Sequence, residues 1–188
     1  SSPFAGGTAI VGSYYYGFGF QVEAQSYATS YIPTEGTIKT RNKDLCTNGG
    51  DVSLINSTEG VLYAEVSTLY QDNLSSTNGR ITLSSGSTSN RILFYFGLSQ
   101  IKFYYIVAGQ PSIAFSANGD STDLNKLAIS YKANELKFWL NGVLVYTNTS
   151  NIVFPTNTLN KLNFTDANSQ LPFFGNTKAL GVWKEALT

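Results

Sequence analysis

One stretch, residues 136–146 with the sequence LKFWLNGVLVY, constrains the fold more than any other part of the chain. Apolar side chains at every second position of 136–140 would form one row facing a core, with the other row outside. Asn141 and Gly142 then tolerate the positive φ that a type I′ turn requires, and a second apolar segment follows. The stretch therefore predicts a β-hairpin.

Similar strand-like segments recur along the chain, and no segment shows the apolar i, i+3, i+4, i+7 spacing of a helix. We therefore expect an all-β sandwich of two packed antiparallel sheets. The predicted core includes Leu62, Val66, Leu136, Phe138, Leu140 and Val182. Outside the hairpin, the predicted strands cover residues 14–22, 38–45, 60–70, 80–83, 90–97, 100–108, 112–117, 127–131, 161–164 and 177–183.

Charge and composition argue against several classes of function. Twelve Lys and Arg residues balance twelve Asp and Glu residues, and only 13% of residues are charged. Nucleic acids and anionic membranes are held by basic patches, so we expect no nucleic acid partner. No apolar run approaches the length of a membrane span, so we expect no membrane insertion. The chain has no His, which removes the usual general base at neutral pH and the commonest zinc ligand.

Cys46 is the single cysteine, so no internal disulfide can form, and we expect it to be a small buried residue. A domain without disulfides suggests production in a reducing cytosol and later release, as for virion components. The start, SSP, and the absence of Met suggest a piece of a longer polypeptide.

Neutral polar residues and aromatics are abundant, with twelve Tyr and twelve Phe. A sugar offers hydroxyls at its edge and C–H groups on its faces, so such a composition suits a glycan-binding surface. The same composition is also ordinary for the strands and turns of a β-sandwich.

Residues 127–143, LAISYKANELKFWLNGV, resemble the neighbouring strands of laminin-G-like, concanavalin-A-like lectin domains, and 174–188 resemble the family's closing strand. The resemblance implies a two-sheet antiparallel jelly roll of the lectin/glucanase type over residues 37–188. On this resemblance, we expect the domain to lack the helix that usually follows the closing strand. Asn125 and Lys126 depart from the pattern, because many members have Trp and His there.

Two further phrases, FQVEAQSYATSYIPT at 20–34 and INSTEGVLYAEV at 55–66, resemble segments of bacteriophage tail-fibre and other virion surface proteins. The resemblance implies that residues 1–36 are a leading strand and linker, either the end of an upstream module or a strand added to this one. It also implies a place at the virion surface, outside the cell. A host-surface glycan is the implied partner, and copies of the chain could associate as a homo-oligomer within a fibre.

Glucanases of this fold carry carboxylates at alternate positions of one strand, in an E-x-D-x-x-E pattern, so that they point into one cleft. The closest pair here, Glu59 and Glu65, does not complete such a trio. We therefore predict a non-catalytic glycan-binding module rather than an enzyme. A structural spacer or assembly module of the same fibre is the alternative, with a glucanase-like enzyme less favoured.

Candidate ligand-binding residues follow from strand alternation. Trp139 should point out of the sandwich beside Asn141, where its indole could stack on a sugar. Tyr104 and Tyr105 are adjacent, so one of them must face outward. Glu65 is the remaining candidate, and a solvated or hydrogen-bonded surface role is the alternative for it.

Oxygen ligands in two late loops predict a possible Ca²⁺ site. The alternative is that these side chains bond the backbone of their own turns. The candidate ligands are Asn118, Asp120, Asp123 and Asp166.

Overall fold

A computed structural model describes residues 20, 22, 31–33, 35–40, 52–69, 79–110 and 112–187. The chain divides into two units, Ser1–Leu45 and Cys46–Thr188, and the strands found among the described residues belong to the second. Most of the strand predicted at 14–22, most of the one at 38–45, and Cys46 lie outside the described residues. The predicted limits 1–36 and 37–188 stay a prediction.

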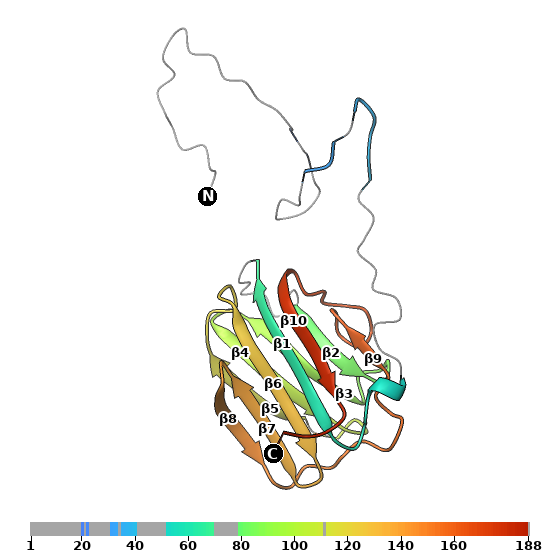
Figure 1. The fold of residues 1–188 in the computed structure, drawn as a ribbon, viewed down its shortest axis with the longest axis vertical. Helices are drawn as coiled ribbons and strands as arrows, with labels where there is room; N and C mark the ends of the chain where they lie inside the picture. Colours follow the sequence, from blue (N-terminus) through green and yellow to red (C-terminus); the bar gives the residue numbers. More distant parts are fainter. Residues whose placement is uncertain are drawn as a thin grey trace. The chain divides into compact units, whose positions relative to one another are not determined.

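Ten strands form two sheets, which Figure 1 shows as two layers. The front sheet has the order β10-β1-β6-β7-β8, and the back sheet has the order β5-β4-β3-β2-β9. The front strands are β1 (Gly60–Thr68), β6 (Asn125–Lys132), β7 (Glu135–Leu140), β8 (Val143–Asn148) and β10 (Gly175–Trp183). The back strands are β2 (Arg80–Ser84), β3 (Arg91–Gly97), β4 (Gln100–Ile106), β5 (Ile113–Asn118) and β9 (Lys161–Asn163).

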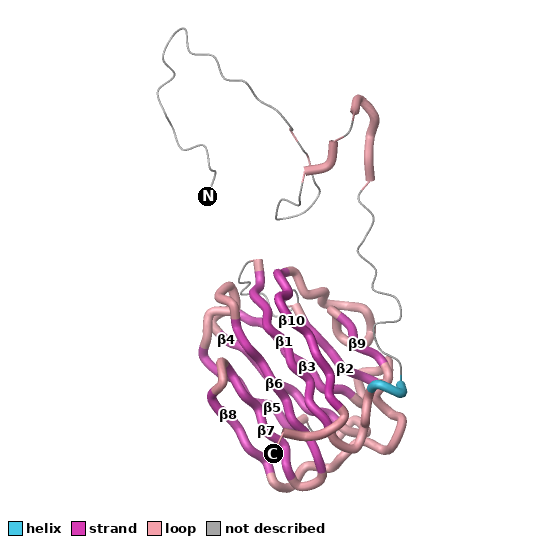
Figure 2. Tube along the Cα trace, in the orientation of Figure 1, coloured by secondary structure: helices cyan, strands magenta, loops and turns pink. Residues whose placement is uncertain are grey.

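Every pair of neighbouring strands is antiparallel, so the all-β, two-sheet jelly-roll prediction is confirmed. Within the described residues the only helical element is the 3₁₀ turn η1 (Val52–Leu54), drawn in cyan in Figure 2. None of the described helical segments is long and apolar enough to cross a membrane.

The predicted hairpin is β7–β8, and its turn has the predicted conformation. Asn141 has φ of 52° and Gly142 has φ of 82°, as a type I′ turn requires. Leu140 pairs with Val143 across the turn, and Phe138 is fully buried while Trp139 is partly exposed. The period-2 pattern therefore assigned the two faces of β7 correctly.

Aromatic rings connect the two sheets. Phe103 of the back sheet stacks on Phe138 of the front sheet, with centroids 5.2 Å apart, and Phe138 stacks on Tyr146 at 5.1 Å. Tyr146 in turn contacts Phe115 at 5.4 Å, so the edge strands β8 and β5 also meet. Four predicted core residues are fully buried, whereas Leu140 and Val182 are partly buried and pack against the core.

Two core tyrosines keep their hydroxyls hydrogen-bonded. Tyr131 donates to the carbonyl of Asn56 at 2.6 Å, and Tyr105 donates to the carbonyl of Ile152 at 2.8 Å. Burial raises the pKa of both hydroxyls. These bonds satisfy polar atoms that would otherwise destabilise the core, and they tie loops to the strands.

Phe138→Ala should lower the free energy of unfolding by about 3–5 kcal/mol, because it removes the ring that stacks on both Phe103 and Tyr146. Urea unfolding followed by circular dichroism measures the loss. Leu144→Ala is the matched control, since Leu144 is 48% exposed on the neighbouring strand β8. Equal losses for the two variants would contradict this account of the core.

Candidate functional site

Because side chains alternate along a strand, each sheet has an inner and an outer face. Some predicted ligand residues lie on the outer faces, and others lie in the core or in a turn. On the front sheet, Ala128 of β6 pairs with Tyr63 of β1 on one side and with Trp139 of β7 on the other. Trp139 is partly exposed there, so its predicted outward orientation is confirmed. A small residue thus lies between two aromatic side chains on this face.

Glu65 lies on the same outer face but is engaged in an ion pair. Its Oε1 lies 2.9 Å from Nζ of Lys178 on β10, and the hydroxyl of Tyr63 lies 3.5 Å from Oε2. The hydrogen bond from Lys178 lowers the pKa of Glu65, although partial burial opposes the shift. Glu65 is therefore an ionised partner of Lys178 rather than a free acid.

Two predicted ligand residues have structural contacts instead. Tyr105 is 2% exposed, with its ring in the core, so it cannot contribute to an outer surface and the prediction for it is corrected. Asn141 has its side-chain oxygen bonded to the N–H of Lys126 at 2.8 Å and its nitrogen bonded to Asn125 Oδ1 at 3.1 Å. The Asn141 amide thus holds the hairpin turn against the start of β6.

The front face also carries an aromatic residue that the sequence analysis missed. Trp183 is 52% exposed and meets Tyr63 edge-on with centroids 6.1 Å apart. Its indole lies over Gly181, where an added Cβ would come within 2.5 Å of the ring. The spacing of a Gly two residues before a Trp on one strand is the sequence signal for this packing.

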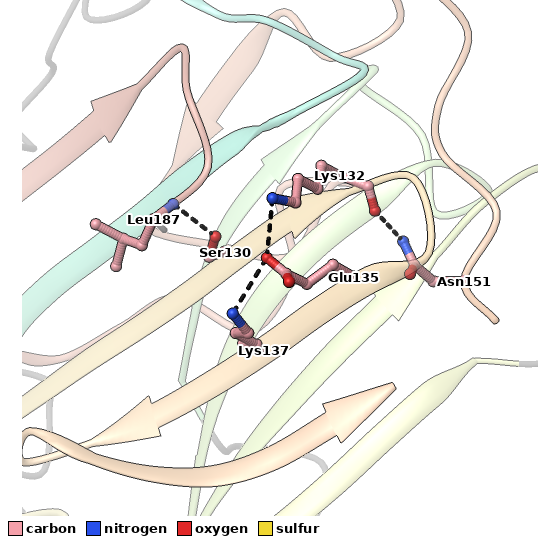
Figure 3. Close-up of polar contacts among 6 residues, drawn as sticks. All are labelled: Ser130, Lys132, Glu135, Lys137, Asn151 and Leu187. Carbon is pink, nitrogen blue, oxygen red and sulfur yellow. Dashed lines mark hydrogen bonds and ion pairs between the residues drawn. The ribbon is translucent and has the colours of Figure 1, made fainter. Parts of the chain in front are cut away.

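Part of the front face is covered by the segment after β10. The backbone N–H of Leu187 donates to Oγ of Ser130 at 3.0 Å, and Ser130 is 2% exposed (Figure 3). In the same view, Glu135 lies 3.2 Å from Nζ of both Lys132 and Lys137. These contacts stabilise the β6–β7 hairpin and leave less of this face open to a ligand.

Two of the four candidate calcium residues, Asp120 and Asp166, bond groups of their own loops. Asp120 Oδ1 accepts from the N–H and hydroxyl of Thr122, at 2.8 and 2.6 Å. Asp166 Oδ1 accepts from the N–H groups of Asn168 and Gln170, at 3.0 and 2.7 Å. Among the described residues, no three His, Cys, Asp or Glu side chains form a group that could hold a metal ion. The site made of Asn118, Asp120, Asp123 and Asp166 therefore stays a prediction.

The outer face of the back sheet gathers a different set of side chains, which we call the arginine–tyrosine surface. Arg80 pairs with Tyr95 across β2 and β3, and Tyr104 of β4 lies next to Tyr95 with ring centroids 6.2 Å apart. Arg91 begins β3. The surface consists of Arg80, Thr82, Arg91, Tyr95 and Tyr104.

Two cations lie over the ring of Tyr95 on this surface. The guanidinium carbon of Arg80 and the Nζ of Lys102 each lie 5.2 Å from the ring centroid of Tyr95. Such contacts are worth about 0.5–1 kcal/mol each when exposed. Tyr95 is 7% exposed beneath these side chains, whereas Tyr104 is partly exposed, so Tyr104 is the ring that a ligand can reach.

Four buried polar atoms of this surface have no hydrogen-bond partner in the protein. They are Nε of Arg80, Oγ1 of Thr82, and Nε and Nη1 of Arg91. A buried donor or acceptor left unpaired costs about 1–3 kcal/mol, so native proteins rarely leave several together. In native proteins such atoms are usually paired with ordered water, an ion or another bound group.

Several neighbouring groups shift the pKa of Arg91 on this surface. Burial lowers the pKa of its guanidinium, and the nearby charge of Arg80 lowers it further. The carboxylate of Asp166 and the hydroxyl of Tyr104 act in the opposite direction. Arg91 therefore sits among groups of both signs, with a second arginine close enough to repel it.

The sequence alone gave only a weak signal for this surface. Arg80 and Thr82 alternate with core residues, as do Arg91 and Tyr95, which is compatible with one outer face. Nothing in the sequence states that β2 pairs with β3 in the register that brings the two arginines together. The sequence analysis selected Tyr104 and missed both arginines.

The fold is similar to that of solved carbohydrate-binding structures. One is "Ruminococcus gnavus IT-sialidase CBM40 bound to alpha2,3 sialyllactose", with a TM-score of 0.55, 13% identity, and coverage of 70% of this chain and 78% of the other. The same module bound to alpha2,6 sialyllactose gives a TM-score of 0.53 at 12% identity, covering 70% and 79%. No family model and no curated protein matches the sequence.

A leech intramolecular trans-sialidase, complexed with 2,7-anhydro-Neu5Ac, gives a TM-score of 0.51 at 14% identity. That match covers 70% of this chain but only 22% of the leech enzyme. At such identities the similarity shows the fold alone. It confirms the lectin-like β-sandwich expected from the sequence and gives no support to a tail-fibre context.

Glu65→Gln should cost more stability at pH 7 than at pH 3. The folded-state pKa of Glu65 is lowered from an ordinary value of 4.5, so its contribution is present above that value and is lost as the pH falls through the folded-state pKa. Urea unfolding of both proteins at the two pH values measures the difference. A double-mutant cycle with Lys178→Gln should assign the effect to this pair. A pH-independent difference would contradict the assignment.

Proposed function

We propose that this chain is a non-catalytic glycan-binding module and that the arginine–tyrosine surface is its binding site. The observation that carries the proposal is the cluster of four unpartnered polar atoms beside the partly exposed ring of Tyr104. Sugar hydroxyls can accept from and donate to such atoms, while a ring face can pack on a tyrosine.

The fold supports this proposal, because the structures it resembles include a carbohydrate-binding module with bound sialyllactose. Two features of the chain argue against catalysis. It contains no His. Among its described residues, no three His, Cys, Asp or Glu side chains lie together, and Glu65 is paired with Lys178. Hydrolysis of a glycosidic bond needs two carboxylates facing one sugar.

The front face is the alternative location for the site. Tyr63, Trp139 and Trp183 give it more aromatic surface than the back face has. On this face, however, Glu65 is paired with Lys178, and the segment after β10 bonds Ser130. A ligand there would have to displace contacts, whereas on the back face it would supply missing ones.

The wider setting of the module is a further part of the proposal and rests on sequence resemblance alone. In that setting the module is exposed on a virion surface, outside the cell, binds a host-surface glycan and associates with other copies in a fibre. A structural spacer of the same fibre is the competing function. A spacer has no reason to bind a glycan, so the binding experiment distinguishes the two.

Tyr104→Ala should weaken glycan binding about tenfold, because it removes the aromatic face on which a sugar ring packs; a tenfold change corresponds to about 1.4 kcal/mol. Screening the chain on a glycan array and titrating its best ligand into wild type and variant by calorimetry measures the effect. Trp139→Ala, an aromatic truncation on the opposite outer face, is the matched control and should leave the affinity unchanged.

Two results would overturn the proposal. Loss of binding in Trp139→Ala but not in Tyr104→Ala would move the site to the front face. Binding to no glycan on a broad array would remove the function itself and favour the spacer.

A further inference from the structure

We propose that Arg80 and Arg91 together bind the anionic group of an acidic sugar, a carboxylate or a sulfate, at the arginine–tyrosine surface. The inference rests on the proposed function and narrows its ligand to a charged class. The two residues that carry it come from neighbouring antiparallel strands, β2 and β3, and face the same side of the back sheet.

The first argument is the distribution of arginine in a chain of zero formal net charge. The chain contains three arginines, and two of them are on this one surface. In the register of β2 and β3, Arg80 lies opposite Tyr95 and Arg91 lies opposite Ser84. The Thr82–Leu93 pair lies between them, so two long side chains can converge over it from both ends.

The second argument is that neither arginine has an acidic partner of its own. Among the described residues, the ion pairs within 4.0 Å all involve lysines on the front sheet: Lys132 and Lys137 with Glu135, and Lys178 with Glu65. Asp166 is the acidic group that influences Arg91, but its Oδ1 already accepts two backbone N–H groups. The surface therefore keeps an excess of positive charge.

The third argument is the geometry of the donors. Nε of Arg80, and Nε and Nη1 of Arg91, have no acceptor in the protein and are themselves buried, whereas each arginine as a whole is partly exposed, so an anion reaches these donors when the side chains turn outward. The guanidinium group presents its N–H donors in a planar fork that matches carboxylate and sulfate oxygens. A neutral hydroxyl satisfies one donor at a time, whereas an anion satisfies several and also relieves the repulsion between the two arginines.

Tyr104 and Tyr95 complete the site. The guanidinium of Arg80 lies over the Tyr95 ring, which fixes its plane, and the Tyr95 and Tyr104 rings meet edge-on. An acidic sugar bound by the arginines would then have its ring next to Tyr104. The anionic group gives the charge recognition, and the tyrosine gives contact with the sugar itself.

The test uses three probes that share one core: lactose, 3′-sialyllactose with a carboxylate, and 3′-sulfolactose with a sulfate. Each is titrated into the whole chain by calorimetry or by NMR. We expect at least one acidic probe to bind ten times or more tighter than lactose, with an affinity that falls as salt is raised. The two acidic probes distinguish a carboxylate ligand from a sulfate ligand.

Arg91→Gln and Arg80→Gln should each weaken the affinity for the acidic probe at least tenfold. Neither substitution should change the affinity for lactose. Lys137→Gln, which removes a cation from the front sheet, is the matched control and should change neither. Thermal melting checks that each variant is folded. Arg91→Lys keeps the charge but loses the fork, and it should restore only part of the acidic affinity.

Two results would overturn this inference while leaving glycan binding in place. One is equal affinity for lactose and both acidic probes, or preference for a neutral glycan on the array. The other is tight binding of an acidic probe that folded Arg80→Gln and Arg91→Gln variants retain. If no neutral or acidic glycan binds at all, the proposed function fails together with it.

Discussion

The stack of aromatic rings between the sheets is the contact on which the rest of this structure depends. Phe103 reaches from the back sheet to Phe138, Phe138 contacts Tyr146, and Tyr146 contacts Phe115 at the facing edge strands. This chain of contacts joins the sheets both at the centre and along one edge. Because the inner rows are fixed by close packing, the alternate rows on each strand must face outward.

The two outer faces then differ in how their polar groups are used. On the front face, Glu65 and Lys178 bond each other, and the segment after β10 bonds Ser130. On the back face, Arg80 and Arg91 have buried donors without acceptors. A surface whose polar groups are already satisfied is stable without a ligand, whereas one with unpaired donors gains free energy when a ligand supplies acceptors. That difference, rather than the number of aromatic residues, favours the back face as the binding site.

Side-chain identity alone did not predict which candidate residues are free to bind a sugar or a cation. The sequence predicts Asn141 as a sugar ligand, yet its side-chain amide bonds β6 through both its oxygen and its nitrogen. Tyr105 was chosen with Tyr104, and alternation correctly required one of them to face out, but which one depended on the register with β3. Asp120 and Asp166 look like cation ligands in sequence, and in the fold they bond their own loops.

The sequence by itself determined the local structure: the hairpin at Asn141 and Gly142, the strand alternation that buries Phe138 and exposes Trp139, and from these an all-β sandwich. Turn chemistry and period-2 patterning act within a few residues, so they can be read along the chain. Only the tertiary structure decided that Arg80 and Arg91 share one surface, because that depends on which strands pair and in which register. Strand pairing and register depend on long-range packing of the whole core, so a local sequence pattern does not predict them.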